Sequence, residues 1–421
     1  MPVRRNLGCN GLDHALSRRG FTAGGMGAAL ALPALAAAAP SADLRGGHKR
    51  ILQIYLQGGV SQFESWDPKP GTLYGGPSRA IETSVPGIRI SELLPHTAQQ
   101  MHHLSIVRSI NLKTNDHGVG RKIMERGRRQ EGYPYIGAVA AKYFSPPASP
   151  LPGYIHISSR GLTDATDAFL GPRYAQLRLE GVKPPENISR LPDISSASFR
   201  RRNLFRLRLN RRLGNRGQRS ATDLYNGSFE QAQLLMSRQS LFDGQAQARD
   251  LQRYGEHFFA RNCIFARNLL EQGATCVKVT HHGYDSHAEN FNFHLEQLGE
   301  FDRPFATLLD DLHQRGMLES TLVVVMSEFG RTPKINRNYG RDHWGASLSV
   351  ALGGAGIKPG MVIGKTNDQG TEVADREVDG GHLFHTYFQA LGLDTTRPHD
   401  KPGSPVPIGD PAMEPIRELL A

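Results

Sequence analysis

The segment Thr321–Ser327 (TLVVVMS) constrains the fold more than any other part of the chain. It is an unbroken run of aliphatic and β-branched residues, without the alternating polar residues of a strand that has one wet face. Such a run is typical of a central strand that is buried on both faces of a sheet. Five further short apolar runs are also predicted to be strands: Ile51–Leu56, Leu104–Arg108, Tyr154–Ser158, Cys276–Thr280 and Leu348–Leu352.

Stretches with helical periodicity alternate with these runs. Apolar residues recur every three or four positions from Leu298 onward, and Gly316 supplies a stop. Pro304 is expected to kink or restart this helix. Two more helices, Phe258–Gln272 and His382–Leu391, are each followed by a glycine. Strands that alternate with helices predict an α/β fold, with a mostly parallel central sheet flanked by helices.

Residues 160–255 carry few strand signals, which predicts a mostly helical insertion. The chain has 50 Lys+Arg and 40 Asp+Glu, which gives a formal charge of +10. The excess of positive charge lies in this segment, because nine arginines and no acidic residue occur from Arg200 to Arg219. We expect an amphipathic helix with its arginines in water, and attraction to an acidic polymer or a membrane surface is the alternative. Four leucines interrupt the arginines: Leu204, Leu207, Leu209 and Leu213.

Residues 1–40 have the pattern of a twin-arginine export signal. The pair Arg18-Arg19 precedes TAGGMGAALALPALAAAA, a weakly apolar run of 18 residues that ends in small residues suited to cleavage after Ala38 or Ala39. A permanent membrane span is the weaker interpretation, and no transmembrane segment is expected after the signal is removed. We expect a periplasmic or secreted protein. Nucleic acid is not an expected partner, because the arginine segment lacks an interleaved aromatic platform.

Two cysteines, Cys263 and Cys276, lie beyond this leader, and Cys9 lies within it. Both sit in apolar patterns and are expected in the core, although a disulfide is the alternative in an oxidising compartment. The chain has no CxxC pair, so a thiolate metal site is not expected.

Carboxylates and imidazoles follow three of the predicted strands. In an open parallel sheet, ligands bind beyond the carboxyl ends of the strands, so these side chains are expected to share one edge. The candidates are Asp116 and His117 after the second strand, His281, His282, Asp285 and His287 after the fourth, and Glu328, Arg331, Asp342 and His343 after Thr321–Ser327.

This mixture of oxygen and nitrogen donors suits one divalent metal ion. Zinc or manganese is favoured over magnesium or calcium, because imidazole is prominent in the set. Each motif also has a structural interpretation. An Asp-His pair in a loop is often a solvated turn, adjacent histidines often serve packing, and Glu328 with Arg331 could form a buried ion pair that fixes a loop.

Several long motifs carry a family resemblance through essentially the whole chain. They are GGVSQFESWDPKPG (58–71), GYDSHAENF (283–291), SEFGRTPKIN (327–336), GRDHW (340–344) and AGIKPGMVIGKT (355–366). With the leader, they resemble the exported bacterial family known as domain of unknown function 1501. That family is similar in turn to the alkaline phosphatase and sulfatase superfamily. The resemblance implies an alkaline-phosphatase-like three-layer domain over residues 48–421.

The superfamily pattern also implies a site, from which this chain departs. A metal-binding Asp is expected after the first strand, where this chain has Gln57-Gly58-Gly59. His117 falls about where the nucleophile is expected. Asp285 with His287 resembles a ligand pair, and His343 lies where a further ligand is expected. A two-metal phosphatase needs enough carboxylate to neutralise both ions, so a single ion is the better hypothesis.

Two functional hypotheses follow from these residues. The first is a metal-dependent hydrolase of phosphate or sulfate esters, on a small molecule or a polysaccharide. His117 would be a ligand, a general base or, least favoured, a nucleophile. The remaining ligand candidates are Asp285, His287, Glu328 and His343, with Asp342 or Arg331 behind them or on an anionic substrate. The second hypothesis is a non-catalytic binding or assembly protein, in which Arg331 and Arg341 pair with Glu328 and Asp342.

Overall fold

The computed structural model describes residues 47–421 except 148, 150, 160–165, 186–187, 243–245 and 400–404. The predicted export signal at residues 1–40 lies outside the described residues.

An eight-stranded sheet forms the centre of the fold, in the order β12-β4-β11-β8-β1-β7-β5-β6. All neighbouring strands are parallel except at β11, which is antiparallel to both β4 and β8. All six predicted strands are confirmed. The strands are β1 (Arg50–Gln57), β4 (Leu104–Ile110), β5 (Tyr154–Ser158), β6 (Leu177–Glu180), β7 (Cys276–His282), β8 (Thr321–Met326), β11 (Leu348–Gly353) and β12 (Val362–Ile363).

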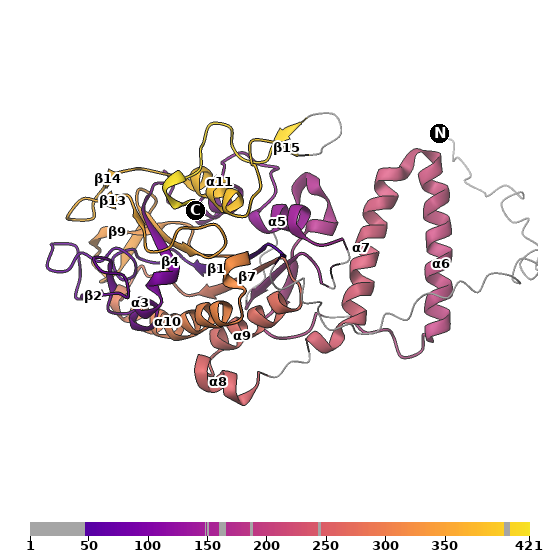
Figure 1. The fold of residues 1–421 in the computed structure, drawn as a ribbon, viewed down its shortest axis with the longest axis horizontal. Helices are drawn as coiled ribbons and strands as arrows, with labels where there is room; N and C mark the ends of the chain where they lie inside the picture. Colours follow the sequence, from indigo (N-terminus) through magenta and orange to yellow (C-terminus); the bar gives the residue numbers. More distant parts are fainter. Residues whose placement is uncertain are drawn as a thin grey trace, which may run out of the picture. The chain divides into compact units, whose positions relative to one another are not determined.

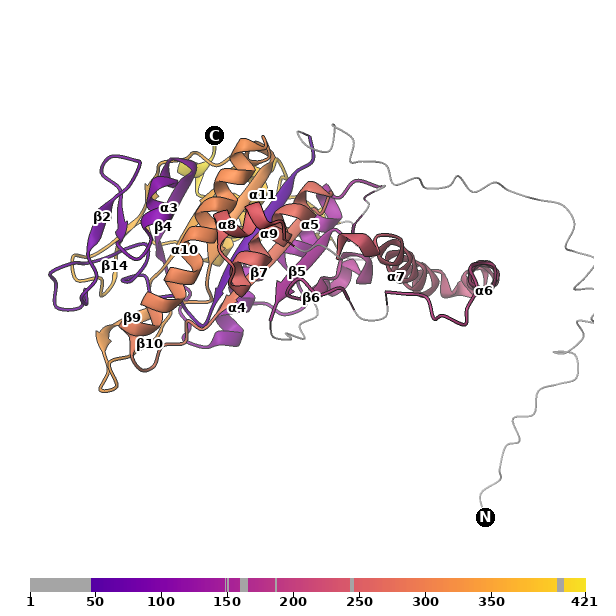
Figure 2. The same cartoon turned by 90° about the horizontal axis from the view of Figure 1, so that it is seen from below.

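Successive residues of the central strands face two separate hydrophobic cores. In β8, Val323 and Val325 face one core, while Leu322, Val324 and Met326 face the other. Helices α3, α8, α9 and α10 contribute to the first core, and α4, α5 and α11 to the second. The sheet therefore lies between two helical layers, as Figures 1 and 2 show and as the apolar run in β8 predicts.

The helices of these layers are α3 (Pro95–Gln99), α4 (His117–Arg126), α5 (Ile136–Phe144), α8 (Ala248–Tyr254), α9 (Phe258–Glu271), α10 (Asn290–Gln314) and α11 (Gly380–Ala390). The predicted helices at α9 and α11 are confirmed within two residues. The predicted restart at Pro304 is wrong, since α10 runs through this residue. A proline inside a helix removes one backbone hydrogen bond, and burial of the surrounding apolar face offsets that loss.

In the part of the chain that the structure describes, four two-stranded sheets accompany the central sheet. They are β2 (Ala80–Glu82) with β3 (Arg89–Ser91), β9 (Gly330–Ile335) with β10 (Arg341–Trp344), β13 (Lys365–Thr366) with β14 (Val373–Asp375), and β15 (Pro398–His399) with β16 (Val406–Pro407).

Helices predominate between residues 166 and 255, where α6 (Ser196–Leu213) and α7 (Arg219–Ser237) precede α8. The short strand β6 also lies in this region and extends the central sheet, which the sequence did not predict. Among the described residues, no helix combines the length and apolar character needed to cross a membrane. Cys263 and Cys276 are free and buried, as expected of core residues.

A buried ion pair joins helix α4 to the sheet. Nζ of Lys278, in β7, contacts Oε1 of Glu125, in α4, and Gln53 in β1 donates to the same oxygen at 2.8 Å. Lys278 and Glu125 are both almost completely inaccessible to water. Because a charge in such a place is destabilising without its partner, this pair fixes α4 against β1 and β7.

Replacement of Lys278 by methionine is expected to destabilise the protein by about 3–5 kcal/mol, because the Glu125 carboxylate would stay buried without a cation. Chemical denaturation would measure the loss. The double variant Lys278→Met/Glu125→Leu should recover most of the stability. Lys183, which pairs with Glu180 on the surface, provides the matched control, and Lys183→Met should cost no more than about 1 kcal/mol. Equal losses in the two single variants would contradict a structural role for the buried pair.

Candidate functional site

The ends of three adjacent parallel strands bring the candidate residues together. Strands β8, β1 and β7 are neighbours in the sheet, and the chain continues from them into Glu328, Gly58 and Asp285. Gly58 permits the close approach of two of these segments. It has a φ of +116°, and a Cβ atom there would lie 2.5 Å from the backbone nitrogen of Asp285. The site therefore begins where glycine lets the segments after β1 and β7 touch.

Arg331 ties these segments to one another. Its guanidinium is completely buried and donates to the carbonyl oxygen of Gly59 at 2.9 Å and to that of Arg341 at 3.0 Å. It also donates to the Gly58 carbonyl and, at 2.6 Å, to Oδ1 of Asp285. Arg331 therefore fixes the position of the Asp285 carboxylate, and its burial separates it from any substrate in solution.

Three histidines surround Asp285, and each has its Nδ1 atom held by an acceptor. Nδ1 of His117 lies 2.8 Å from Glu328 Oε1, and Nδ1 of His287 lies 2.9 Å from Asp342 Oδ1. Nδ1 of His343 lies 2.8 Å from the carbonyl oxygen of Asn115. Carboxylate and carbonyl partners of this kind orient the histidine ligands of metal sites, because they leave Nε2 free.

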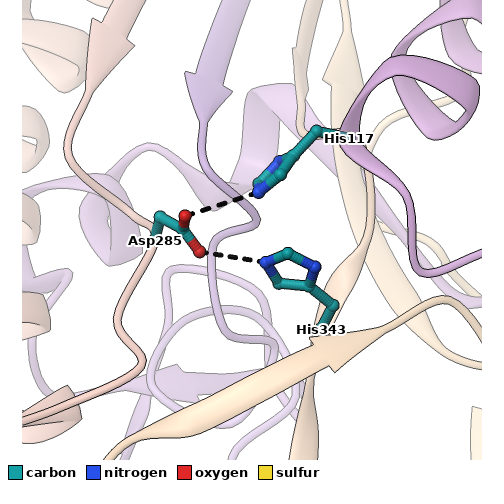
Figure 3. Close-up of side chains that lie close together, drawn as sticks. All are labelled: His117, Asp285 and His343. Carbon is teal, nitrogen blue, oxygen red and sulfur yellow. Dashed lines mark hydrogen bonds and ion pairs between the residues drawn. The ribbon is translucent and has the colours of Figure 1, made fainter.

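The Nε2 atoms of these rings converge on the Asp285 carboxylate. Those of His287 and His343 are each 3.1 Å from Oδ1 and 2.9 Å from each other. Nε2 of His117 lies 3.4 Å from Oδ2, on the other side of the carboxylate. Figure 3 shows His117 and His343 pointing at the two oxygens of Asp285. Among the described residues, His117, Asp285 and His343 form a group whose ligand atoms all lie within 4.8 Å of one another.

Hydrogen-bond chemistry favours a positive charge at this point. A carbonyl oxygen can only accept, so Nδ1 of His343 carries a proton and its neutral ring presents a lone pair at Nε2. That lone pair faces a carboxylate oxygen and a second imidazole nitrogen. These acceptors repel one another unless an additional proton or a metal cation lies between them. The donor set of imidazoles and carboxylate therefore fits a divalent ion.

The pKa values of two members reflect this surrounding charge. Burial alone would raise the pKa of Asp285, but the hydrogen bond from Arg331 and the positive charge of its guanidinium lower it to about 2. Burial lowers the pKa of His343, which favours its neutral form. Asp285 is thus ionised and His343 neutral at pH 7, the protonation states in which both side chains bind metals.

Glu328, one of the expected ligands, lies outside this group. Its side chain is buried, and Oε1 accepts from the Gly58 backbone at 2.9 Å as well as from His117. Oε2 accepts from Ser327 Oγ at 3.0 Å. The hydrogen bond that His117 donates to Glu328 is the main factor that raises the pKa of His117. Because both oxygens have partners, Glu328 acts as the support of His117 in this structure.

The arginine pairings of the second hypothesis are wrong. Arg331 contacts Asp285 instead of Glu328, and Arg341 donates to Glu64 at 3.0 Å instead of pairing with Asp342. Arg341 and Glu64 are completely buried, and this pair anchors β10. Asp342 holds Nδ1 of His287. This contact places Asp342 behind a candidate ligand, which is one of the positions expected for it from the sequence.

A cleft of about 440 Å³ opens beside the cluster. The sequence interpretation missed Arg121, which lines it together with Gln57 and His282. Arg121 lies one helical turn after His117, so a helix that begins at His117 places both side chains on the same face. A predicted start of α4 at His117 would therefore have identified Arg121 as a candidate. The cleft is lined by Tyr55, Gln57, Gly58, His117, Gly118, Arg121, His282, Gly283, Asp285 and Glu328.

Several solved structures have a similar fold at low sequence identity. Ps i-CgsB in complex with k-i-k-neocarrahexaose is 11% identical, with a TM-score of 0.42 over 82% of this chain and 72% of that one. An alkaline phosphatase from the Antarctic bacterium TAB5 is 12% identical, with a TM-score of 0.39 over 82% and 99%. The phosphonate monoester hydrolase SpPMH from Silicibacter pomeroyi is 11% identical, with a TM-score of 0.39 over 88% and 76%.

No curated protein matches the sequence. A family model described as a protein of unknown function, DUF1501, matches residues 48–420, which span the central sheet and every residue of the cluster. The family expected from the sequence motifs is therefore confirmed, and the chain belongs to the DUF1501 family of proteins of unknown function.

Proposed function

We propose that this protein is a metal-dependent hydrolase of phosphate or sulfate esters. The observation that carries the proposal is the convergence of three imidazole Nε2 atoms on one carboxylate, with each Nδ1 atom held by an acceptor. A purely structural cluster does not require three lone pairs to face a carboxylate.

Asp285, His287 and His343 would hold one divalent ion. Their ligand atoms are 2.9–3.1 Å apart, close to the spacing of about 3.3 Å between neighbouring ligands of a tetrahedral zinc ion. Zinc or manganese suits two imidazoles and one carboxylate better than magnesium or calcium does. A bound ion of this kind polarises an ester oxygen and acidifies water.

His117 would act as the general base. Glu328 holds its Nδ1 atom, so Nε2 faces the cleft and the Asp285 carboxylate with a lone pair that can accept a proton from water. Glu328 would fix the ring and stabilise its protonated form, because hydrogen bonding to Glu328 raises the pKa of His117.

An anionic ester group suits the cleft for two reasons. Arg121, a cationic residue, is part of its wall. His117 and Gly118, which also line it, are the first residues of helix α4, whose N-terminus carries a partial positive charge. The cleft volume of about 440 Å³ accommodates a small phosphate or sulfate ester, or one esterified sugar of a longer chain.

The wall residues favour direct attack by water. Among the described residues that line the cleft, the one hydroxyl belongs to Tyr55, and none of them is serine, threonine or cysteine. Burial raises the pKa of Tyr55 well above its usual range, so this hydroxyl does not ionise readily. The same observation favours a second candidate function, the binding of an anionic ester without turnover.

The proposed metal site predicts that the purified protein binds zinc or manganese at one ion per chain. His343→Ala and His287→Ala should each reduce the affinity at least tenfold, because each removes one ligand. Calorimetric titration and elemental analysis would measure the loss. His96→Ala, at an exposed position outside the cluster, should bind as the unaltered protein does. A full complement of metal in both cluster variants would contradict this assignment.

His117→Gln is expected to lower kcat for an aryl phosphate or aryl sulfate by roughly 10²–10⁴-fold while the metal content stays the same. The reason is that glutamine can still occupy the space beside Glu328 but cannot accept a proton as a base. Steady-state kinetics with metal analysis of the same samples would separate the two roles. A parallel loss of metal would instead make His117 a ligand. Binding of aryl esters without hydrolysis by the metal-loaded unaltered protein would support the second candidate function.

Arg121→Gln is expected to raise KM for an anionic ester by roughly 10–100-fold, because a charge-assisted hydrogen bond to the substrate would be lost. The neighbouring Lys122 is a matched control, since it pairs with Glu131 on the surface and does not line the cleft. Kinetics for Lys122→Gln should be unchanged. An equal change of KM in the two variants would contradict a direct contact between Arg121 and the substrate.

We also propose export to the periplasm or beyond by the twin-arginine route, on the sequence of residues 1–40. Arg18→Lys/Arg19→Lys in the native host should leave the protein in the cytoplasm, as fractionation would reveal.

A further inference from the structure

Helices α6 and α7, with the turn Gly214–Gln218 between them, form a surface that the proposed hydrolase site does not use. We call these residues, 196–237, the arginine hairpin. The chain reverses where Gly217 adopts a φ of +91°, and the two helices run antiparallel side by side in Figures 1 and 2. The predicted helix over the arginine segment is present, but none of its residues is buried.

One arginine holds the hairpin together. Arg206 donates to Asn203 within α6 and to Asn226 of α7, and its guanidinium stacks over the ring of Phe229 at 4.0 Å. Asn210 adds a hydrogen bond of 2.7 Å to Asn226. No residue of α6 is buried by this pairing, so its leucines stay accessible to solvent.

Large apolar side chains of the hairpin are instead exposed. The exposed fraction is 57% for Leu204 and 61% for Phe205. Between the two helices lies a groove of about 430 Å³, to which Phe205, Leu209 and Tyr225 contribute. Exposed apolar side chains gathered on one element, beside charged ones, are typical of an interaction surface. The other large apolar residues that the hairpin exposes are Leu207, Leu213 and Leu224.

The exposed arginines of α6 have no acidic partner. The hairpin holds nine arginines and two acids, Asp223 and Glu230. Among the residues that the structure describes, only Arg219 lies within 4.0 Å of one of these two carboxylates. Among the described residues, no carboxylate pairs with the six exposed arginines of α6: Arg200, Arg201, Arg202, Arg208, Arg211 and Arg212. The hairpin is therefore a cationic surface in which Leu204 and Leu207 lie among free guanidinium groups.

We propose that the arginine hairpin docks the protein on an anionic lipid membrane. The charge makes a second copy of the hairpin an unsuitable partner, because two such surfaces repel each other. A soluble acidic polymer would satisfy the arginines but would leave the leucines in water. An anionic bilayer satisfies both, since phosphate headgroups accept from arginine while Leu and Phe side chains enter the acyl boundary.

Flotation of the full chain with vesicles tests this proposal. The protein should bind vesicles that contain phosphatidylglycerol and should bind vesicles of phosphatidylcholine alone much more weakly. Binding should weaken as the salt concentration rises from 0.1 M to 1 M, where the Debye length falls from about 10 Å to about 3 Å. Equal binding to both vesicles, or no binding to either, would overturn the proposal.

Two variants separate the charged and apolar contributions. Neutralising five arginines to glutamine should weaken binding roughly 100-fold, while Arg206 is kept so that the hairpin folds. Leu204→Gln/Leu207→Gln should weaken binding roughly tenfold, because two exposed apolar anchors are lost. Circular dichroism would show that each variant keeps its helices. The five arginines are Arg200, Arg201, Arg208, Arg211 and Arg212.

A matched control removes five exposed basic residues from elsewhere in the chain and should bind vesicles as the unaltered protein does. Docking through the hairpin would be contradicted if this control weakened binding as much as the hairpin variants do, or if both hairpin variants bound as the unaltered protein does. The second result is also the one expected if residues 1–40 drive vesicle binding. Two further results would overturn the proposal. One is tight binding of the protein to a soluble acidic polysaccharide, if the leucine variant binds it equally well. The other is dimerisation through the hairpin, as light scattering would detect it. The control positions are Arg249, Lys334, Lys358, Lys365 and Arg397.

Discussion

The arrangement of the candidate site depends on the buried guanidinium of Arg331. Burial lowers its pKa, and a cation removed from water is tolerated only where acceptors replace the lost solvation. The fold supplies four: the carbonyls of Gly58, Gly59 and Arg341, and the Asp285 carboxylate. These acceptors come from the segments after β1 and β7 and from β10, so satisfying one charge fixes three parts of the chain. The carboxylate on which the histidines converge is therefore held before any ligand arrives.

The three histidines show how the fold sets the chemistry of side chains that are distant in sequence. His117 opens α4, His287 follows β7, and His343 lies in β10. Each receives its Nδ1 acceptor from yet another segment, through Glu328, Asp342 or the Asn115 carbonyl. Orientation of the rings is thus a tertiary property. A histidine count or a short motif contains no information about which ring nitrogen faces the cleft.

The sequence was most informative where the physical rule was local or depended on sheet edges. Unbroken apolar runs identified the central strands. The rule that ligands bind beyond the carboxyl ends of parallel strands predicted that Asp285 and His343 would lie at one edge of the sheet. The antiparallel direction of β11 was not predicted, because a strand buried on both faces looks the same in either direction. The partner of Arg331 was also missed. Its proximity to Glu328 in sequence suggested a pair, but the turn after β8 points the two side chains at different neighbours, His117 and Asp285.

The end of strand β1 is the reason why we propose one ion at this site and not two. Where the resemblance implies a metal-binding Asp, the chain has Gly58, whose backbone nitrogen donates to Glu328 Oε1. The same oxygen accepts from His117, and Oε2 accepts from Ser327, so Glu328 is committed to the protein. A second ion would have to displace at least one of these contacts and would gain no new carboxylate from β1. Glu328 therefore supports His117, and the site that we propose holds one ion and a histidine base.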